Sequence, residues 1–382
     1  MEKRVREELP KARRLVVKVG TKLLCGNTGQ LDMKRMRALT HDLAEVWKHG
    51  REVVLVSSGA IGAGVGRLGL SRVPQTIPEK QAAAAVGQGI LMHLYEKLFA
   101  QEGIVVAQVL LTREDITNRM RYLNARNTLE TLFHYKVIPI VNENDTVAVE
   151  EIRFGDNDTL AALVACVVDA DLLVLLTDME GFFTRDPHKS GEGKLIHQIE
   201  EITPEIEALA GGKGSPLATG GMETKIQAAK ITMEAGIPLI IASGLHEGTL
   251  LRILEGEEVG TLFVPRHDRM QARKRWIAFG SSVQGRIWID EGAVVALLRN
   301  GKSLLPSGVT DVEGCFEKGA VVSVVDPSGR EVARGITNYS ADEIRLIKGK
   351  KTKEIREILG YKDYDEVIHR DNLTVMSDFN GH

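Results

Sequence analysis

Short apolar segments alternate with longer helix-like segments along the first two thirds of this chain. The apolar segments are rich in Val, Ile and Leu, which is typical of strands that are buried on both faces of a sheet. They span residues 14–19, 53–57, 104–111, 137–141, 172–176 and 238–242. Helix-like segments separate them at 32–49, 79–102, 123–135, 158–169 and 221–235. This alternation predicts an α/β fold, a three-layer αβα sandwich with a mainly parallel central sheet.

The pattern changes after about residue 264. Residues 266–275 are polar and basic and are expected to form a linker that follows a first domain over 1–265. Beyond it, short β-like runs separated by turn residues predict a small β-rich domain over about 276–360, followed by a charged tail over 361–382. The runs lie at 286–290, 293–298, 320–326, 331–337 and 343–347.

Composition argues against a disordered protein and against a membrane protein. Hydrophobic residues make up 43% of the 382 residues and charged residues 26%, with a net charge of -3, which are ordinary values for a globular protein. The N-terminus is highly charged, and no apolar run reaches the roughly 18 residues of a membrane span, so a cytoplasmic protein is expected. The three cysteines, at 25, 166 and 315, have neither disulfide nor metal-site spacing and are expected to be reduced.

Glycine turns follow the first two predicted strands. Lys18 lies at the end of the first strand beside Gly20, at the sheet edge where open α/β folds bind ligands. A lysine there could contact a phosphate, or it could simply extend along the surface. Ser58, in the turn after the second strand, could bind a carboxylate or only cap a helix.

Two glycine-containing segments resemble nucleotide-binding motifs only in part. The segment from Gly64 to Gly69 fits G-x-G-x-x-G, but it begins several residues after the strand, and no ribose-binding acid follows at the required distance. The run from Gly301 to Ser303 imitates the end of a phosphate-binding loop, but the earlier glycine is replaced by Ala296. Neither motif predicts a nucleotide site.

Acidic and amide side chains gather after the fourth predicted strand, in residues 142–146 and 153–158. Carboxylates accept hydrogen bonds from an ammonium group, amides can donate to a carboxylate, and an acid can orient a lysine. A solvated turn that caps the next helix is the alternative reading. Two clusters so close together favour a site that recognises an amino acid.

Two further loops could hold a nucleotide. Thr177 and Asp178 end the fifth predicted strand, and the segment 219–225 opens a helix whose free N–H groups favour an anion. Lys225 lies in this segment, where it could meet a phosphoryl group. Two lysines and several glycine turns are what phosphoryl transfer requires, since its catalysis is mostly positioning and charge neutralisation.

Six ordered motifs resemble the glutamate 5-kinases of the amino acid kinase family. They are VKVGTKLL, VSSGAIGAG, PIVNENDTV, FGDNDTL, LLTDMEGFFTRDP and TGGMETK, within about residues 12–265. The resemblance implies the amino acid kinase fold and the ATP- and Mg²⁺-dependent phosphorylation of L-glutamate to L-glutamyl 5-phosphate, the first step of proline biosynthesis. Residues 276–360 look like a PUA domain.

The same resemblance assigns roles to matching residues. Lys18 and Lys225 would flank the transferring phosphoryl group, with Asp158 holding both lysines. Glutamate would be bound by Ser58, Asp145 and Asn157. ATP would be bound by Lys18, Thr177, Asp178, Thr219, Gly220, Gly221, Met222, Glu223, Thr224 and Lys225. The ligands of Mg²⁺ are not identified, and Arg153 stands where the family usually has lysine.

The resemblance further implies feedback inhibition by proline, a dimer or tetramer, and transfer of the labile product to glutamyl-phosphate reductase. A sibling amino acid kinase is the nearest alternative. The second alternative is an RNA-binding or RNA-modifying protein, which the PUA-like part suggests. Residues 276–382 carry 14 Lys and Arg against 16 Asp and Glu, so binding to nucleic acid is not expected, despite a basic cluster at 348–353.

Overall fold

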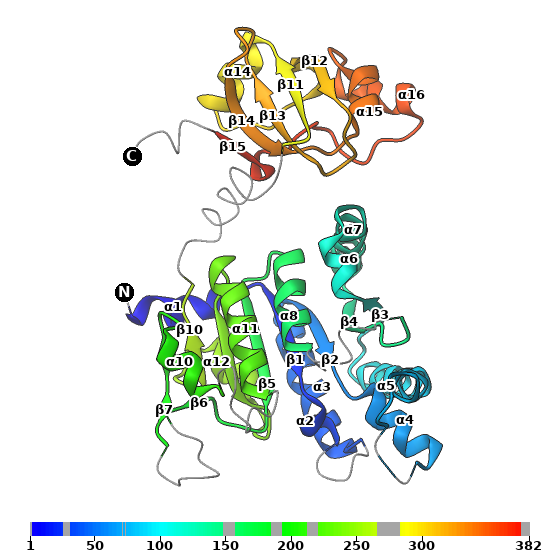
Figure 1. Ribbon diagram of the computed structural model, residues 1–382, viewed down its shortest axis with the longest axis vertical. Helices are drawn as coiled ribbons and strands as arrows, with labels where there is room; N and C mark the ends of the chain where they lie inside the picture. Colours follow the sequence, from blue (N-terminus) through cyan, green and yellow to red (C-terminus); the bar gives the residue numbers. More distant parts are fainter. Residues whose placement is uncertain are drawn as a thin grey trace. The chain divides into compact units, whose positions relative to one another are not determined.

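The computed structural model forms two compact units, Met1–His267 and Asp268–His382 (Figure 1). It describes residues 2–25, 31–70, 72, 74–147, 157–184, 193–211, 221–265 and 283–375.

An eight-stranded sheet forms the centre of the first unit, with the strand order β3-β4-β2-β1-β5-β9-β10-β8. The first six of these strands run parallel, and β10 is antiparallel to β9. All six predicted strands are confirmed. The strands are β1 (Arg14–Val19), β2 (Glu52–Ser57), β3 (Val106–Leu111), β4 (Ile138–Glu143), β5 (Leu172–Thr177), β8 (Gln198–Ile199), β9 (Leu239–Ser243) and β10 (Thr261–Phe263).

Helices cover both faces of this sheet. Successive residues of a strand point to opposite faces, and in β1 Val17 packs into one apolar cluster while Val16 packs into the other. The first cluster includes residues of α3 (Met33–Lys48), α5 (Ile77–Gln101) and α12 (Thr249–Leu254). The second includes residues of α7 (Arg119–His134), α8 (Asn157–Val167) and α11 (Gly221–Glu234). The predicted three-layer αβα sandwich is therefore confirmed.

The remaining elements of the first unit are short. They are α1 (Glu2–Glu8), η1 (Leu9–Lys11), α2 (Thr21–Cys25), α4 (Ala60–Leu68), α6 (Arg113–Thr117), α10 (Pro204–Leu209) and the β6–β7 pair (Phe182–Phe183, Leu195–Ile196). None of the helices in the described ranges combines the length and apolar character that crossing a bilayer requires.

The glycines after β2 serve helix packing. A side chain at Gly64 of α4 would place its Cβ only 1.8 Å from the carbonyl oxygen of Ala83 in α5. At Gly87 of α5, a Cβ would lie equally close, 1.8 Å, to the carbonyl oxygen of Ala60. The G-x-G-x-x-G match therefore starts inside a helix whose backbone directly contacts another helix, and it forms no nucleotide loop.

A five-stranded sheet with the order β12-β11-β13-β14-β15 forms the second unit. Its strands are β11 (Gly285–Ile289), β12 (Val309–Gly314), β13 (Val321–Val325), β14 (Glu331–Ile336) and β15 (Leu373–Val375). The helices are α14 (Glu291–Leu298), η3 (Pro306–Gly308), α15 (Ala341–Ile347), η4 (Thr352–Glu354), α16 (Ile355–Leu359) and η5 (Arg370–Asn372). The prediction of a β-rich unit is confirmed.

Two of its predicted β-like runs, 293–298 and 343–347, were wrong, because both lie in helices. Asp290 caps α14 by accepting a hydrogen bond from the Ala293 N–H. Ser340 and Glu343 form a reciprocal capping box at the start of α15. These caps fix helical starts that the apolar composition alone did not reveal. The sheet also continues past residue 360, since β15 pairs with β14 inside the expected tail.

Candidate active site

The ends of the parallel strands bring the predicted residues to one edge of the first sheet. β1 lies between β2 and β5, and Val19 is opposite both Ser57 and Leu176. Lys18, Ser58 and Thr177 therefore come from three adjacent strands and their following turns. This is the edge at which parallel α/β sheets bind ligands.

Two lysines share one buried carboxylate at this edge. Lys18 Nζ lies 2.5 Å from Asp158 Oδ1, and Lys225 Nζ lies 2.9 Å from Asp158 Oδ2. Asp158 is 2% exposed and each lysine 7%. Lys18 is 140 positions and Lys225 67 positions from Asp158 along the chain, so only the fold brings the three together.

Two helix starts present the residues of this cluster. Asp158 is in the first turn of α8, and Lys225 lies one turn after the first residue, Gly221, of α11, which packs beside α8 (Figure 1). Thr224 Oγ1 also donates to Asp158 Oδ2 at 2.8 Å, and Lys225 Nζ donates to the Gly221 carbonyl at 2.9 Å. The orientation of both α11 side chains is thus fixed by hydrogen bonds.

The charges explain how this carboxylate stays ionised in the interior. Burial by itself raises the pKa of Asp158, but the two ammonium groups and their hydrogen bonds outweigh burial and lower the pKa to about 2. One carboxylate facing two ammonium groups leaves a net positive charge in a poorly solvated place. Such a cluster can stabilise an anion whose negative charge grows during a reaction.

A network of amides lies on the side of β2 and β4. Asn157 Nδ2 is within hydrogen-bond distance of the Ser57 carbonyl at 3.0 Å, Ser58 Oγ at 2.9 Å and Asn142 Oδ1 at 3.0 Å. The helix after β2 is capped by Gly59 without a side-chain hydrogen bond. Ser58 is therefore not the ordinary helix cap that the sequence left open.

Sequence reasoning named Asn142 only as part of a polar cluster and missed Gln88 and Tyr95 altogether. Asn142 Nδ2 donates to Gln88 Oε1 at 2.7 Å, and the buried Tyr95 hydroxyl lies 2.8 Å from Ser57 Oγ. Both Gln88 and Tyr95 belong to α5, Gln88 in its alanine- and glycine-rich part and Tyr95 in the largely apolar part that follows, and neither part contains a recognisable binding motif. No sequence signal marked them.

Asp145 lies just beyond β4 and is half-buried. Its burial raises its pKa to about 6. No hydrogen bond or ion pair to this carboxylate occurs in the described part of the chain. A half-buried acid without a counter-charge is suited to receive a cationic group of a ligand.

The predicted nucleotide residues are only partly described. Thr177 Oγ1 donates to Asp178 Oδ1 at 3.0 Å, and Asp178 is exposed at the end of β5. Met222 packs against the apolar cluster beneath α11. At the start of α11, Gly221 is exposed and Glu223 is half-buried. Thr219, Gly220 and Arg153 lie outside the described residues.

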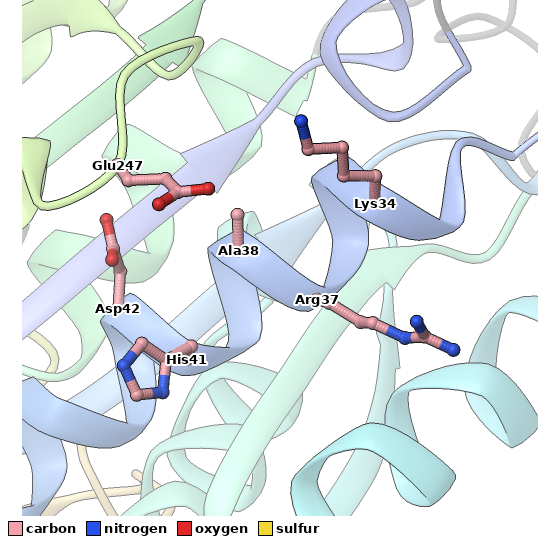
Figure 2. A pocket seen from close by; sticks show the side chains of 6 residues that line it. All are labelled: Lys34, Arg37, Ala38, His41, Asp42 and Glu247. Carbon is pink, nitrogen blue, oxygen red and sulfur yellow. The ribbon is translucent and has the colours of Figure 1, made fainter.

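A hollow of about 340 Å³ lies away from these residues, along α3 (Figure 2). In Figure 2 the Asp42 and Glu247 carboxylates lie on the same side of the hollow, while the Arg37 side chain points away from them. None of the predicted site residues lines this hollow. Its charged, open lining gives it no evident ligand.

His41, Glu45 and Glu102 place their potential ligand atoms within 4.8 Å of one another near the same helix. The ammonium group of Lys48 lies 2.7 Å from Glu102 and 3.0 Å from Glu45, so it already neutralises these carboxylates. In the second unit, Lys348 of the basic cluster is paired with Asp311 at 2.6 Å. These groups are satisfied by neighbouring protein charges.

Comparisons with known proteins agree with the fold and with the motifs. A model of the amino acid kinase family matches residues 13–243, and a model of the PUA domain matches residues 285–359. A glutamate 5-kinase of Moorella thermoacetica is 60% identical over 375 residues, which cover 98% of this chain and 99% of that protein. One from Carboxydothermus hydrogenoformans is 54% identical over 97% of this chain and 100% of that protein.

Among solved structures, a carbamate kinase from Giardia lamblia bound to AMP-PNP is 21% identical, with a TM-score of 0.47 over 67% of this chain and 99% of that chain. The identity of the two nearly full-length relatives, together with both family models, decides the assignment. The chain is an enzyme of the amino acid kinase family, belongs to its glutamate 5-kinase branch and carries a PUA domain.

Proposed function

We propose that this enzyme transfers the γ-phosphoryl group of ATP to the side-chain carboxylate of L-glutamate. The product would be L-glutamyl 5-phosphate, the first intermediate of proline biosynthesis. The observation that carries the proposal is the buried Lys18–Asp158–Lys225 cluster at the carboxyl edge of the sheet. The names of the two nearly full-length relatives support glutamate as the acceptor.

The strand order separates the two proposed substrate sites. Ser58, Asn157 and Asp145 follow β2 and β4 on one side of β1, where they would bind glutamate. Thr177, Asp178 and the start of α11 lie on the other side, where ATP would bind, with Thr219 and Gly220 as further proposed contacts. Lys18 extends from β1 between them. This arrangement would bring the acceptor carboxylate and the γ-phosphate together at the two lysines.

In this proposal the lysines neutralise charge that develops during transfer. Glutamate and ATP are both anions, so their reacting oxygens repel each other until cations lie between them. Asp158 holds the two ammonium groups in place before the substrates arrive, so little reorganisation is needed in the transition state. No protein nucleophile is required, because the glutamate carboxylate itself attacks phosphorus and ADP leaves.

Mg²⁺ is proposed to enter with ATP. Both oxygens of Asp158 contact ammonium groups, which makes this carboxylate unsuitable as a metal ligand. Mg²⁺ in kinases is commonly held by substrate phosphates and one or two carboxylates, and it neutralises phosphate charge. The exposed Asp178 offers a suitable oxygen donor on the nucleotide side.

The substrate can be tested by trapping the acyl phosphate. With ATP, Mg²⁺, glutamate and hydroxylamine, the enzyme is expected to form a hydroxamate, because the acyl phosphate reacts readily with this nucleophile. Aspartate and N-acetylglutamate in place of glutamate are expected to give little product. Hydroxamate from either of these, and none from glutamate, would contradict the proposed substrate while leaving the family assignment intact.

Asp145 is expected to control glutamate affinity. Replacing it by alanine removes a charge-assisted partner for the substrate ammonium group, so the Kd for glutamate should rise by about 10- to 100-fold, with a smaller change in kcat. Calorimetric titration would measure the loss. A variant that bound glutamate normally and lost only kcat would contradict this role.

The pH dependence of glutamate binding offers a second measurement on the same group. Only the ionised carboxylate attracts an ammonium group, and burial raises the pKa of Asp145 to about 6. Glutamate affinity is therefore expected to fall as the pH drops through about 6. The Asp145→Asn variant should bind weakly with no such dependence. An equal pH dependence in both proteins would assign the titration to another group.

Three further properties belong to the proposal through the family resemblance. Proline would inhibit at or overlapping the glutamate site, the kinase domains would assemble as a dimer or tetramer, and the labile product would pass to glutamyl-phosphate reductase. The cytoplasm, where ATP is available, is the proposed location. Competition between proline and glutamate in binding titrations would test the first of these.

A further inference from the structure

A chain of amide side chains connects α5 to the edge where glutamate is proposed to bind. Gln88 Oε1 accepts from Asn142 Nδ2 at 2.7 Å, and Asn142 Oδ1 lies 3.0 Å from Asn157 Nδ2. Asn157 Nδ2 in turn lies 2.9 Å from Ser58 Oγ. Gln88 is thus the far end of a relay that leads to two proposed glutamate-binding residues.

We propose that Gln88 is a positioning residue that holds the Asn142 amide in place and, through it, the Asn157 amide on the substrate side. The inference rests on the proposed function, because it concerns the glutamate side of that site. Gln88 would itself touch no substrate.

Two backbone groups, the Glu143 N–H and the Ser57 carbonyl, fix the directions of the Asn142 and Asn157 amides, and Gln88 holds the NH₂ end of Asn142. The Asn142 NH₂ group donates to Gln88 on α5, and the Asn142 oxygen faces Asn157. The Glu143 N–H also donates to this oxygen, at 2.9 Å. The Asn157 NH₂ group faces Asn142, Ser58 and the Ser57 carbonyl, and this backbone carbonyl, 3.0 Å away, can only accept and so fixes the NH₂ end of Asn157. The side-chain oxygen of Asn157 is left for a donor such as the substrate ammonium group.

The other end of Gln88 supports this reading. Gln88 Nε2 is buried and has no hydrogen-bond partner in the part of the chain that the structure describes. An unsatisfied buried donor destabilises a fold, so the amide group is not explained by its own packing. The oxygen that receives Asn142 is the only part of the amide with a described contact. The function of the Gln88 side chain would be to accept the hydrogen bond from Asn142 Nδ2.

Two substitutions separate positioning from packing. Gln88→Met has a similar length but no comparable acceptor, so Asn142 Nδ2 loses its partner and the Asn142 amide loses its anchor on α5. Gln88→Glu keeps an oxygen acceptor and removes the unpaired NH₂ group. Gln101→Met is the matched control, because Gln101 is exposed at the end of the same helix.

The experiment measures kcat, both KM values and the melting temperature for the full-length wild type and the three variants, with hydroxamate as the product. For Gln88→Met we expect the KM for glutamate to rise about tenfold, while kcat and the KM for ATP stay within about twofold. Gln88→Glu and Gln101→Met should keep a KM for glutamate near that of the wild type.

A wild-type KM for glutamate in Gln88→Met would overturn the inference, as would equal losses in Gln88→Met and Gln88→Glu. A fall in melting temperature with proportional changes in all kinetic constants would also overturn it, because that is the behaviour of a packing residue. Failure of the proposed function has a different signature, since the wild type itself would then form no product from glutamate.

Discussion

Replacing Lys225 by methionine is expected to lower kcat by about 10²- to 10³-fold while leaving the Kd for glutamate nearly unchanged. The Lys225 ammonium group lies 2.9 Å from Asp158. In the proposed mechanism it would contact the transferring phosphoryl group and stabilise the negative charge of that group mainly in the transition state. Methionine keeps most of the volume of the side chain but carries no charge. Steady-state rates of hydroxamate formation and a separate glutamate titration would measure the two effects.

The matched control is Lys230→Met on the same helix. Lys230 forms a salt bridge with Glu207 at 2.6 Å, but its side chain is 36% exposed and lies away from the cluster. Its removal should change kcat by less than about twofold, since exposed ion pairs contribute little. A loss confined to the KM for glutamate in Lys225→Met, with normal kcat, would contradict the role assigned to Lys225.

Replacing Asp158 by asparagine is expected to have the largest effect on stability. The substitution leaves two buried ammonium groups without a counter-charge, and breaking one buried pair typically costs about 3–5 kcal/mol. The free energy of unfolding, measured with urea at neutral pH, should fall by at least this amount. Turnover should fall as well, because neither lysine would be held in place.

The stabilisation by Asp158 has a defined pH range. Its pKa of about 2 in the folded protein is below the value of about 3.9 for an unfolded chain, so its contribution is full above about pH 4. It is lost as the pH falls from about 4 toward 2. The difference in unfolding free energy between the wild type and Asp158→Asn should narrow over this range.

Asp169→Asn provides the control for a carboxylate after the same helix. Asp169 pairs with Arg126 at 3.0 Å, but both side chains are partly exposed, at 29% and 24%. Asn also tolerates the positive φ of 50° at this position. The expected loss is below about 1 kcal/mol. Equal destabilisation by Asp158→Asn and Asp169→Asn would show that the buried cluster has no special energetic role.

Local sequence patterns were sufficient for the six parallel strands of the kinase unit, but they missed its short strands β8 and β10 and were insufficient for parts of the PUA unit. Strands buried on both faces of a parallel sheet are continuous apolar runs, and crossover helices must separate them, so 14–19 or 172–176 could be placed without a structure. Apolar runs such as 293–298 are ambiguous by composition. Their helical state depended on the cap at Asp290 and on packing against the small sheet.

The sequence by itself determined the α/β alternation, the positions of the six parallel strands, and the residue types at their ends. It named Lys18 and Lys225 as candidate phosphate contacts from their glycine turns, but only the resemblance linked both lysines to Asp158, because no local pattern connects positions so far apart. Tertiary structure alone decided that one carboxylate contacts both lysines and that Gln88 of α5 reaches Asn142. The physical reason is that these contacts depend on strand order and helix packing, which juxtapose residues irrespective of their separation along the chain.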